Sequence, residues 1–369
     1  MKILISTLSG RVYGGSSYYK NLLPEMLKIN KLDHFYVWTK YRKDIFGEIS
    51  YENLTVFQLG RFADYVFVRV LFEQLVIPIF FIIIRANHIF YGKNIGSILF
   101  AKKNIIAVRN VEPFFYHQYD NSFSRKVISY LRLKTSVYFL RRSFKIVAVS
   151  NYVKNLLVKK FSVPQSKIEV IYNGSNIPSN YENIWRYKGN DNYFIIISKF
   201  IPYANQINLI HAYFKFIKKI SENIPKLIFV GGVYDKKYYD EFLQLNIQYN
   251  LENYILHLGY VTKEKVYQYS SKAITCIHPS KLEACPHSLI EMMSIGVPVI
   301  CSNEGPMEEI MENAGIYFDP DNIDNICHAL LRAYENKNLL NEKSKNGIER
   351  SKKFNWSLSA IKYVNFFHN

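Results

Sequence analysis

Two glutamates bracket the start of one expected helix in the segment HPSKLEACPHSLIEMMSIGVPVICSNEGP, residues 278–306. Pro286 suits a first helical residue and Gly296 a position just past the last, which predicts a helix over about 286–295. The N–H groups and positive dipole end of such a helix form a ready anion site. Glu291 would lie roughly 7 to 8 Å along the axis from that end, about the separation between a diphosphate and its ribose.

Glu283 lies in the loop before this helix. It would face the group attached to the diphosphate on the side opposite the ribose. A sugar with hydroxyl groups is the obvious partner for that carboxylate, and the arrangement then fits a nucleotide-sugar. The spacing alone fits equally well a solvated loop residue at 283 and an exposed helix charge at 291, because short motifs often match by chance.

Short apolar β-rich runs alternate with longer helical stretches, which favours βα units and parallel sheets. We expect strands at 2–8, 34–38, 54–59, 88–92, 104–109, 145–150 and 168–174, with helices at about 16–30, 64–84, 122–143 and 151–161. After a polar segment, strands are expected again at 193–198, 226–232, 254–260, 274–280, 297–302 and 315–320. The expected fold class is α/β, with two doubly wound Rossmann-like domains whose strand ends face a central cleft.

The domain boundaries follow from this alternation. We expect a first domain at 1–174, a linker at 175–191, a second domain at 192–350 and a C-terminal helix at 351–369 that crosses back to the first domain.

Several blocks resemble family 4 glycosyltransferases, which have the GT-B fold and retain anomeric configuration. Glu283 and Glu291, followed by GVPVI at 296–300, are similar to the donor-site signature of that family. STLSGRVYGGSSYY at 6–19 resembles its N-terminal Gly-Gly loop, and ISKFIPYANQINLIHAYFKF at 197–216 its donor loop and helix. The segments 145–174, 254–273 and 304–320 resemble further blocks, so the resemblance runs in order over most of the chain.

The resemblance implies a role for each matching residue. Glu291 would bind ribose hydroxyls and Glu283 the donor sugar, and the implied catalytic residues are Glu283 and Lys199. The first domain would bind the acceptor and the second the nucleotide-sugar. The other implied donor-binding residues are Gly14 and Gly15, whose backbone would approach the phosphates, Pro286, His287, Ser288 and Leu289 at the helix start, and Tyr260 and Val261 near the base.

Two positions depart from the family pattern. Lys199 and Ala204 stand where relatives usually have an Arg and, five residues on, a Lys, both directed at the diphosphate leaving group. Lysine lacks the planar fork of arginine, and losing a preorganised cation costs on the order of 3 kcal/mol, about a hundredfold in rate. Three explanations are open. Lys199 alone stabilises the leaving group, another cation such as Arg11 takes the place of the missing lysine, or the chain has lost its activity. The intact glutamate pair favours the first two explanations.

On the acceptor side, relatives often place a His or an Asp-containing turn after the strand expected at 104–109. Here that position holds Arg109, Asn110 and Glu112, which we expect to line the acceptor side. His117 is interpreted as a surface loop residue. A retaining front-face reaction needs no enzymatic nucleophile, because the departing phosphate can take the acceptor proton.

No metal and no other cofactor is expected besides the nucleotide-sugar substrate, since the pairs Cys276/His278 and Cys285/His287 match no structural zinc spacing. Four cysteines in a chain of 369 residues fit a reducing compartment. The start, MKILISTLSG, has too short an apolar stretch for a signal core. The most apolar run, residues 75–84, is about half the length that a spanning helix needs, so no transmembrane segment is expected.

Charge is concentrated in the first half of the chain. Residues 1–180 hold 26 of the 47 Lys and Arg but 10 of the 30 Asp and Glu, a net charge of +16 against +1 for the rest. Such a field favours a polyanion or an anionic membrane face. Residues 122–145 combine cations with apolar and aromatic side chains, which suits an anionic membrane surface at about 1 kcal/mol per cation, although a solvated helix covering the sheet would look the same.

The function expected is transfer of a hexose from a nucleoside-diphosphate sugar to a hydroxyl of a glycan, with retention, in surface polysaccharide or lipopolysaccharide biosynthesis. The acceptor would be a glycan or lipid-linked glycan, and the protein would be cytoplasmic and peripheral at the inner face of the cytoplasmic membrane. The alternative is a catalytically impaired GT-B protein that binds a nucleotide-sugar or glycan, which Ala204 favours. Nucleic acid is not an expected partner, because no recognisable binding module accompanies the basic half.

Overall fold

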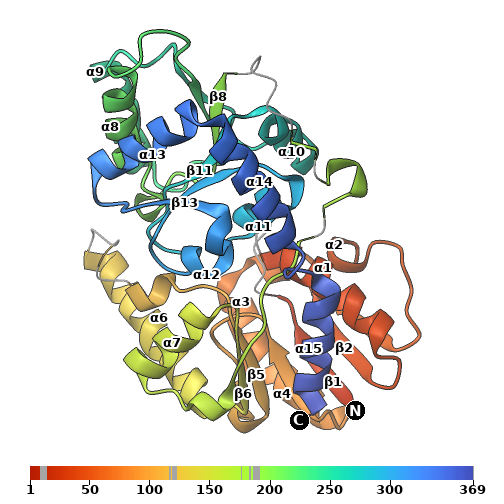
Figure 1. Ribbon diagram of the computed structural model, residues 1–369. Helices are drawn as coiled ribbons and strands as arrows, with labels where there is room; N and C mark the ends of the chain where they lie inside the picture. The colour runs from red at the N-terminus through yellow and green to blue at the C-terminus, as the bar shows by residue number, and fades with distance from the viewer. Residues whose placement is uncertain are drawn as a thin grey trace. The chain divides into compact units, whose positions relative to one another are not determined.

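A computed structural model of the protein describes residues 1–8, 15–115, 118, 123–175, 177–182, 184–185 and 192–368. The chain forms two compact units, Met1–Gly174 with Asn355–Asn369, and Ser175–Phe354 (Figure 1). Part of the segment expected as a linker packs within the second unit. Trp185 is buried there, and its indole N–H donates to the carbonyl oxygen of Ala273 at 2.9 Å.

The first unit is built on a parallel sheet of seven strands in the order β3-β2-β1-β4-β5-β6-β7. The strands are β1 (Lys2–Ser6), β2 (His34–Thr39), β3 (Leu54–Gln58), β4 (His88–Tyr91), β5 (Asn104–Val108), β6 (Lys145–Ala148) and β7 (Ile168–Val170). Its α-helices among the described residues are α1 (Gly15–Ile29), α2 (Lys43–Phe46), α3 (Val66–Leu71), α4 (Ile77–Ile83), α6 (Phe123–Arg142), α7 (Asn151–Phe161) and α15 (Trp356–His368). Each strand lies at an expected position.

The second unit repeats this plan with a parallel sheet of six strands in the order β10-β9-β8-β11-β12-β13. The strands are β8 (Tyr193–Ile197), β9 (Lys226–Val230), β10 (Ile255–His257), β11 (Thr275–His278), β12 (Val299–Ser302) and β13 (Gly315–Phe318). Its helices are α8 (Gln206–Ile217), α9 (Lys236–Gln248), α10 (Lys263–Lys272), α11 (His287–Ile295), α12 (Met307–Met311), α13 (Ile323–Glu335) and α14 (Lys337–Ser351). The expectation of two parallel α/β sheets is confirmed.

Alternation along β1 shows how helices cover both faces of the first sheet. Ile3 and Ile5 pack in the core under α1 and α15, which lie on one side of the sheet (Figure 1). Leu4, between them in sequence, packs with Ile77 and Phe81 of α4 on the other face. Successive side chains of a strand point to opposite faces, so a helix layer is needed on each.

Each sheet contains one point at which the strand order reverses. In the first unit it lies between β1 and β4, and in the second between β8 and β11. In open parallel sheets the crevice outside the carboxyl ends of two such strands is where ligands bind. The loops after β8 and β11 are therefore the part of the second unit in which a site is sought.

Gly174 lies at the point where the C-terminal helix rejoins the first unit. A Cβ added to it would lie 2.3 Å from the backbone nitrogen of Trp356, a buried residue. The Trp356 backbone would have to move to admit even a methyl group, whereas a flexible side chain could turn away.

We expect Gly174→Ala to destabilise the first unit by about 2 kcal/mol, because overpacking against fixed backbone is costly. Urea unfolding followed by circular dichroism measures this. The matched control is Gly347→Ala in α14, where the nearest atom to a new Cβ lies at an ordinary 3.4 Å and belongs to the Met293 side chain. Helix propensity should leave that variant as stable as the parent or slightly more so. Equal unfolding curves for both variants would contradict the packing argument.

One helix of the first unit, expected at about 64–84, is long and apolar enough to span a membrane. α3, the π-helical turn Phe72–Val76 and α4 run on without a break over Val66–Ile83. By length and composition this helix of 18 residues could span a membrane, and 22% of it is buried inside the protein. The expectation that no segment is long enough to span a membrane is therefore wrong, because it was based on the most apolar run alone, residues 75–84.

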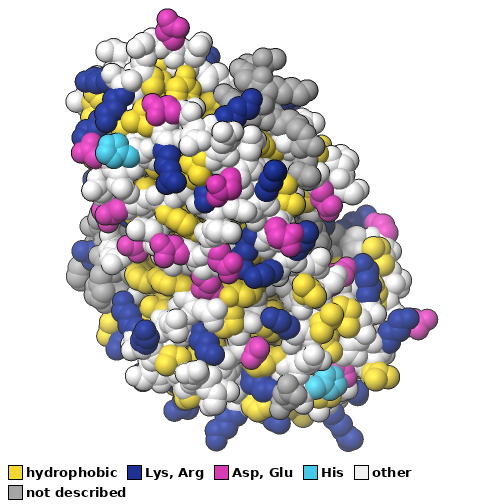
Figure 2. Space-filling view, viewed as in Figure 1, with side chains coloured by type: hydrophobic (Ala, Val, Ile, Leu, Met, Phe, Trp, Pro, Cys, Tyr) yellow, Lys and Arg dark blue, Asp and Glu magenta, His cyan; other side chains and the backbone are white. Residues whose placement is uncertain are grey.

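The basic segment predicted at 122–145 forms α6. Over its first half the apolar residues Val127, Ile128 and Leu131 are exposed beside the cations Lys126 and Arg132. Figure 2 shows the same mixture of Lys and Arg with apolar side chains over the visible face of the first unit. Basic and apolar side chains thus share the exposed surface of α6, and its contact with a membrane stays a prediction.

Candidate functional site

The loop between β11 and α11 carries the first of the two glutamates. α11 begins at His287, with Pro286 as its N-cap, and ends at Ile295, with Gly296 as its C-cap in the left-handed region at a φ of 83°. The helix predicted over 286–295 is therefore confirmed to within one residue. Proline offers no side chain to cap the first N–H groups, so this helix start keeps its affinity for an anion.

Glu283 lies in that loop with its side chain 29% exposed. Its carboxylate is 3.4 Å from Nε2 of His278, the buried last residue of β11. Two hydrogen bonds fix the loop: Ser302 Oγ donates to the Ser280 carbonyl oxygen at 2.6 Å, and the Lys281 N–H donates to the Tyr203 carbonyl oxygen at 2.8 Å. Glu283 is thus a partly exposed carboxylate on a rigidly held loop.

Glu291, on the second turn of α11, is paired with Lys263 at the start of α10. The Lys263 ammonium donates to a carboxylate oxygen of Glu291 at 2.5 Å, and 55% of the lysine side chain is exposed. Burial, together with the negative charges of Glu291 and Glu264, raises the pKa of Tyr267. The Glu291 side chain is only 17% exposed, and its more exposed lysine partner can give way to a ligand.

The segment just before α10 contains the residues expected near a base. Tyr260 is half exposed, and its ring lies against Gly232, where a Cβ would come within 2.2 Å of a ring carbon. Only glycine admits the ring at that distance. This segment, residues 260–262, directly precedes Lys263. The hydrogen bond from Lys263 to Glu291 therefore places the segment close to Glu291.

Lys199, two residues past the end of β8, is held between two tyrosine rings. Its ammonium lies 5.2 Å from the ring centre of Tyr203 and 4.9 Å from that of Tyr234, distances at which a cation is attracted to the ring face. The Tyr203 carbonyl oxygen also accepts the Lys281 N–H, so the turn beside Lys199 is tied to the Glu283 loop. The switch point between β8 and β11 brings these loops together.

Ala204 closes the short 3-10 turn Pro202–Ala204 after Lys199 and is buried, with 3% of its surface exposed. A longer side chain at this position would have to leave the interior to present a charge.

The three residues expected on the acceptor side lie at the carboxyl end of β5 in the first unit. The guanidinium of Arg109 lies 3.9 Å above the Tyr18 ring, and its Nε and Nη1 atoms are buried and have no hydrogen-bond partner among the described residues. Asn110 accepts the Glu112 N–H through its side-chain oxygen at 2.9 Å. The three residues lie together at the end of β5 because they are near neighbours in the sequence.

Gly14, Arg11 and His117 lie outside the described residues, and Gly15 is the first residue of α1. The expectations for these positions stay predictions.

Among the described residues, no group of three His, Cys, Asp or Glu side chains could hold a metal ion. The cysteines are all buried, and burial raises the pKa of Cys276 to about 12 and also raises that of Cys301. Thiols with such pKa values stay protonated near neutral pH and are poor nucleophiles and ligands.

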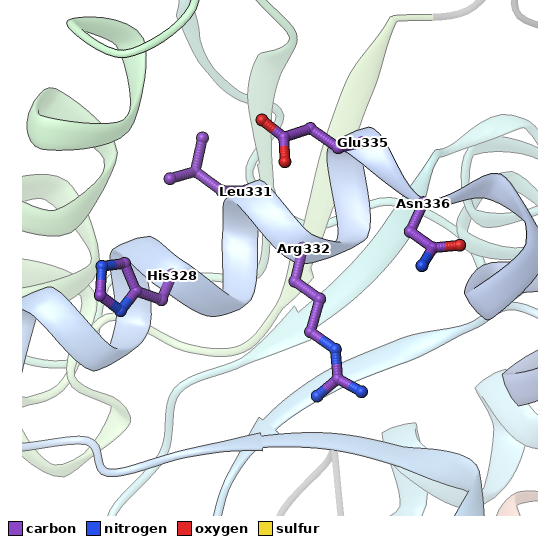
Figure 3. Close-up of a pocket in the computed structure, with 5 residues that line it drawn as sticks. All are labelled: His328, Leu331, Arg332, Glu335 and Asn336. Carbon is purple, nitrogen blue, oxygen red and sulfur yellow. The ribbon is translucent and has the colours of Figure 1, made fainter.

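A surface hollow of about 420 Å³ lies elsewhere, on α13 of the second unit. In Figure 3, Leu331 and Glu335 point to one side of the helix and Arg332 to the other. His328 and Asn336 complete its lining. None of the residues expected from the sequence contributes to it, and its side chains diverge instead of meeting at one point.

Three residues of the site were not expected from the sequence: Lys263 beside Glu291, and Tyr203 and Tyr234 around Lys199. Tyr203 lies four residues after Lys199, within the block that resembles the donor loop, so its contact with Lys199 could have been predicted from the sequence. The other two are distant in sequence from their partners and carry no such signal.

Comparisons with known proteins match the chain to two glycosyltransferase family models. Residues 179–352 match the family described as glycosyl transferases group 1, and residues 101–177 match glycosyltransferase family 4. Over 220 residues the chain is 30% identical to the O-antigen chain mannosyltransferase RfbU of Salmonella typhimurium, a match that covers 60% of this chain and 58% of that protein. The matched stretch thus spans less than two thirds of this relative's length.

Two solved structures resemble the whole chain. A sucrose-phosphate synthase from Thermosynechococcus elongatus superposes with a TM-score of 0.74 at 18% identity, over 100% of this chain and 98% of that one. The Anabaena HepE protein in complex with UDP gives a TM-score of 0.71 at 16% identity, over 99% of each chain. At these identities the likeness establishes a common fold.

Proposed function

Because the chain belongs to the family 4 glycosyltransferases and has their GT-B fold, we propose that it moves a hexose from a nucleoside-diphosphate sugar to a hydroxyl of a lipid-linked glycan. The transfer retains anomeric configuration and serves the biosynthesis of O-antigen or a related surface polysaccharide. Similarity to an O-antigen chain mannosyltransferase supports the class of product.

The observation that carries this proposal is the arrangement around the start of α11. Glu283 precedes the helix on a fixed loop, Glu291 follows on its second turn, and the Lys199 turn is hydrogen-bonded to the same loop. A diphosphate at the helix start would have a carboxylate on either side, one for the sugar and one for the ribose. This order of groups matches a nucleotide-sugar.

Lys199 supplies positive charge to the departing diphosphate. Its ammonium can leave the ring faces of Tyr203 and Tyr234 and contact phosphate oxygens, and the dipole of α11 adds to the same field. The leaving phosphate takes the acceptor proton, so the reaction needs no enzymatic base. Because the Lys199 ammonium and the α11 dipole already stabilise the negative charge that develops on the leaving group, we propose that neither a metal nor another cofactor takes part.

Arg109, Asn110 and Glu112 are our candidates for the acceptor side. Arg109 has buried N–H groups that find no partner among the residues that the structure describes, and such groups can donate to an oxygen of an acceptor. A lipid-linked acceptor would place the protein at the inner face of the cytoplasmic membrane, in agreement with the positive charge of residues 1–180.

The proposal is tested in two steps. Thermal unfolding of the full chain in a panel of UDP-, GDP- and dTDP-sugars identifies the donor, because a ligand of the native state raises the melting temperature. Transfer of that labelled sugar to a lipid extract, with and without EDTA, then tests catalysis. Absence of stabilisation by every donor would overturn the proposal.

A second candidate, a nucleotide-sugar binder without activity, is favoured by Ala204 alone. It predicts tight binding of a donor with no sugar transferred to any acceptor in the extract.

Ala204→Lys separates the two candidates. If Lys199 already neutralises the leaving group, we expect the rate of transfer to stay within about threefold of wild type, because a second cation adds little to a satisfied charge. Since Ala204 is buried, Ala204→Met is the matched control for side-chain bulk. A rate that rises about tenfold or more in the Lys variant and not in the Met variant would instead mean that the natural chain is impaired.

A further inference from the structure

The outer face of the helix Val66–Ile83 is apolar along its whole length. Phe67 and Ile83, near its two ends, are 78% and 70% exposed. We call this surface the apolar helix face; its exposed members are Val66, Phe67, Val68, Val70, Leu71, Leu75, Val76, Ile79, Ile82 and Ile83. Soluble proteins rarely expose a contiguous apolar patch of this extent unless it contacts another molecule.

The opposite side of the same helix is fixed to the first unit. Ile77 and Phe81 pack in the core with Leu4 of β1. Glu73, in the π-helical turn, is buried, accepts a hydrogen bond from Ser6 Oγ at 2.8 Å and forms an ion pair with Lys93. A membrane-spanning arrangement would break this core and bring the Glu73 carboxylate into hydrocarbon, which is costly. The helix must therefore stay on the protein surface.

A neighbouring loop extends the apolar helix face. The side chain of Gln74 donates to the Gly96 carbonyl oxygen at 2.8 Å and accepts the Ile98 N–H at 3.0 Å. These bonds hold the exposed side chains of Ile98 and Leu99 beside the helix.

Charge around this surface is positive. In residues 61–103 the acidic residues are Asp64, which pairs with Lys40, and the buried Glu73. Exposed cations stand at both ends of the helix and after the loop, at Arg61, Arg85, Lys102 and Lys103. An apolar strip with such a rim complements a bilayer surface that contains anionic lipids. A second copy of a chain with net charge +17 would bring like charges together.

We propose that the apolar helix face is a membrane-docking surface. The helix Val66–Ile83 lies in the plane of the membrane interface, its outer side chains enter the acyl region, and the cations around it contact anionic headgroups. This assigns membrane contact to a surface other than α6, and it does not depend on the proposed transfer reaction.

Vesicle binding by the full chain tests the proposal without any sugar substrate. Flotation with vesicles of phosphatidylcholine mixed with phosphatidylglycerol measures the partition coefficient of wild type and of Ile79→Gln/Ile83→Gln, which changes two exposed residues one turn apart. We expect the partition coefficient of this variant to fall by about tenfold or more, since apolar burial drives insertion. The matched control is Leu243→Gln/Ile247→Gln on α9, the same change at exposed positions of the second unit, which should leave binding unchanged.

Two further measurements separate insertion from charge attraction and from self-association. Ile82→Cys, labelled with an environment-sensitive fluorophore, should shift to the blue on vesicles, and the native cysteines, all buried, should resist labelling. Raised salt should weaken wild-type binding without abolishing it. Equal binding of the Ile79→Gln/Ile83→Gln variant and wild type would overturn the proposal, provided that their circular dichroism spectra agree. So would a lipid-free dimer of wild type that this variant abolishes, because the face would then serve a second copy.

Discussion

Glu291→Ala should raise the dissociation constant of the donor nucleotide by about thirtyfold. A carboxylate that accepts hydrogen bonds from ribose hydroxyls contributes about 1.5 to 3 kcal/mol, which corresponds to roughly ten- to a hundredfold in affinity. Isothermal titration with the free nucleoside diphosphate measures this without turnover. The fold should persist, because the Lys263 partner is mostly exposed and pairs of that kind contribute little to stability.

Two controls isolate the ribose contact from the loss of the ion pair. Lys263→Met removes the ion-pair partner of Glu291 and keeps the carboxylate. If the Lys263–Glu291 ion pair only holds Glu291 in place, nucleotide affinity should change by no more than about threefold. Glu264→Ala removes a neighbouring acidic residue in the first turn of α10 and should have no effect on affinity. Unchanged affinity in Glu291→Ala would mean that the carboxylate does not face the nucleotide.

The strands of both sheets could be predicted because parallel strands are buried on both faces. Residues such as Asn104–Val108 in β5, all buried, therefore read as short continuous runs with few polar interruptions. The start and end of α11 could be predicted from Pro286 and Gly296, since each residue type is favoured at one end of a helix for a backbone reason.

Partners brought together by the sheet topology could not be predicted in this way. Lys263 reaches Glu291 across 28 positions because α10 lies next to α11. Tyr234 reaches Lys199 because β9 pairs with β8, which brings the loops at their ends together. Neither pair leaves a periodic or local signal in the sequence, so only three-dimensional structure could supply them.

The apolar helix face shows a different limit of sequence reasoning. The helix itself was predicted at about 64–84, and its hydrophobicity was evident, yet a run of apolar residues is equally typical of a buried helix. The covered side carries Glu73, which contacts Ser6 and Lys93, together with the core residues Ile77 and Phe81. The exposure of Phe67 and Ile83 follows from that orientation and not from their residue types.

Glu283→Gln should lower kcat of sugar transfer by about a hundredfold or more and leave nucleotide affinity within about threefold. The substitution keeps the size of the side chain and removes its charge, so the loop held by Ser302 and Lys281 should not move. A positioned charged group beside a reacting centre typically contributes this much to the rate. If Glu283 contacts the sugar and not the nucleotide, its substitution lowers the rate of the transfer step and does not change nucleotide affinity.

The separation of the two effects is what identifies the role of Glu283. Titration with nucleoside diphosphate measures affinity, and transfer of labelled sugar at saturating donor measures kcat. Glu304→Gln, at an exposed acidic residue in the loop after β12, controls for a general change of charge in this unit and should match wild type in both measurements. A large loss of nucleotide affinity in Glu283→Gln would contradict a contact confined to the sugar. Unchanged kcat would instead exclude Glu283 from the reacting centre and leave Lys199 and the start of α11 as the groups that act on the donor.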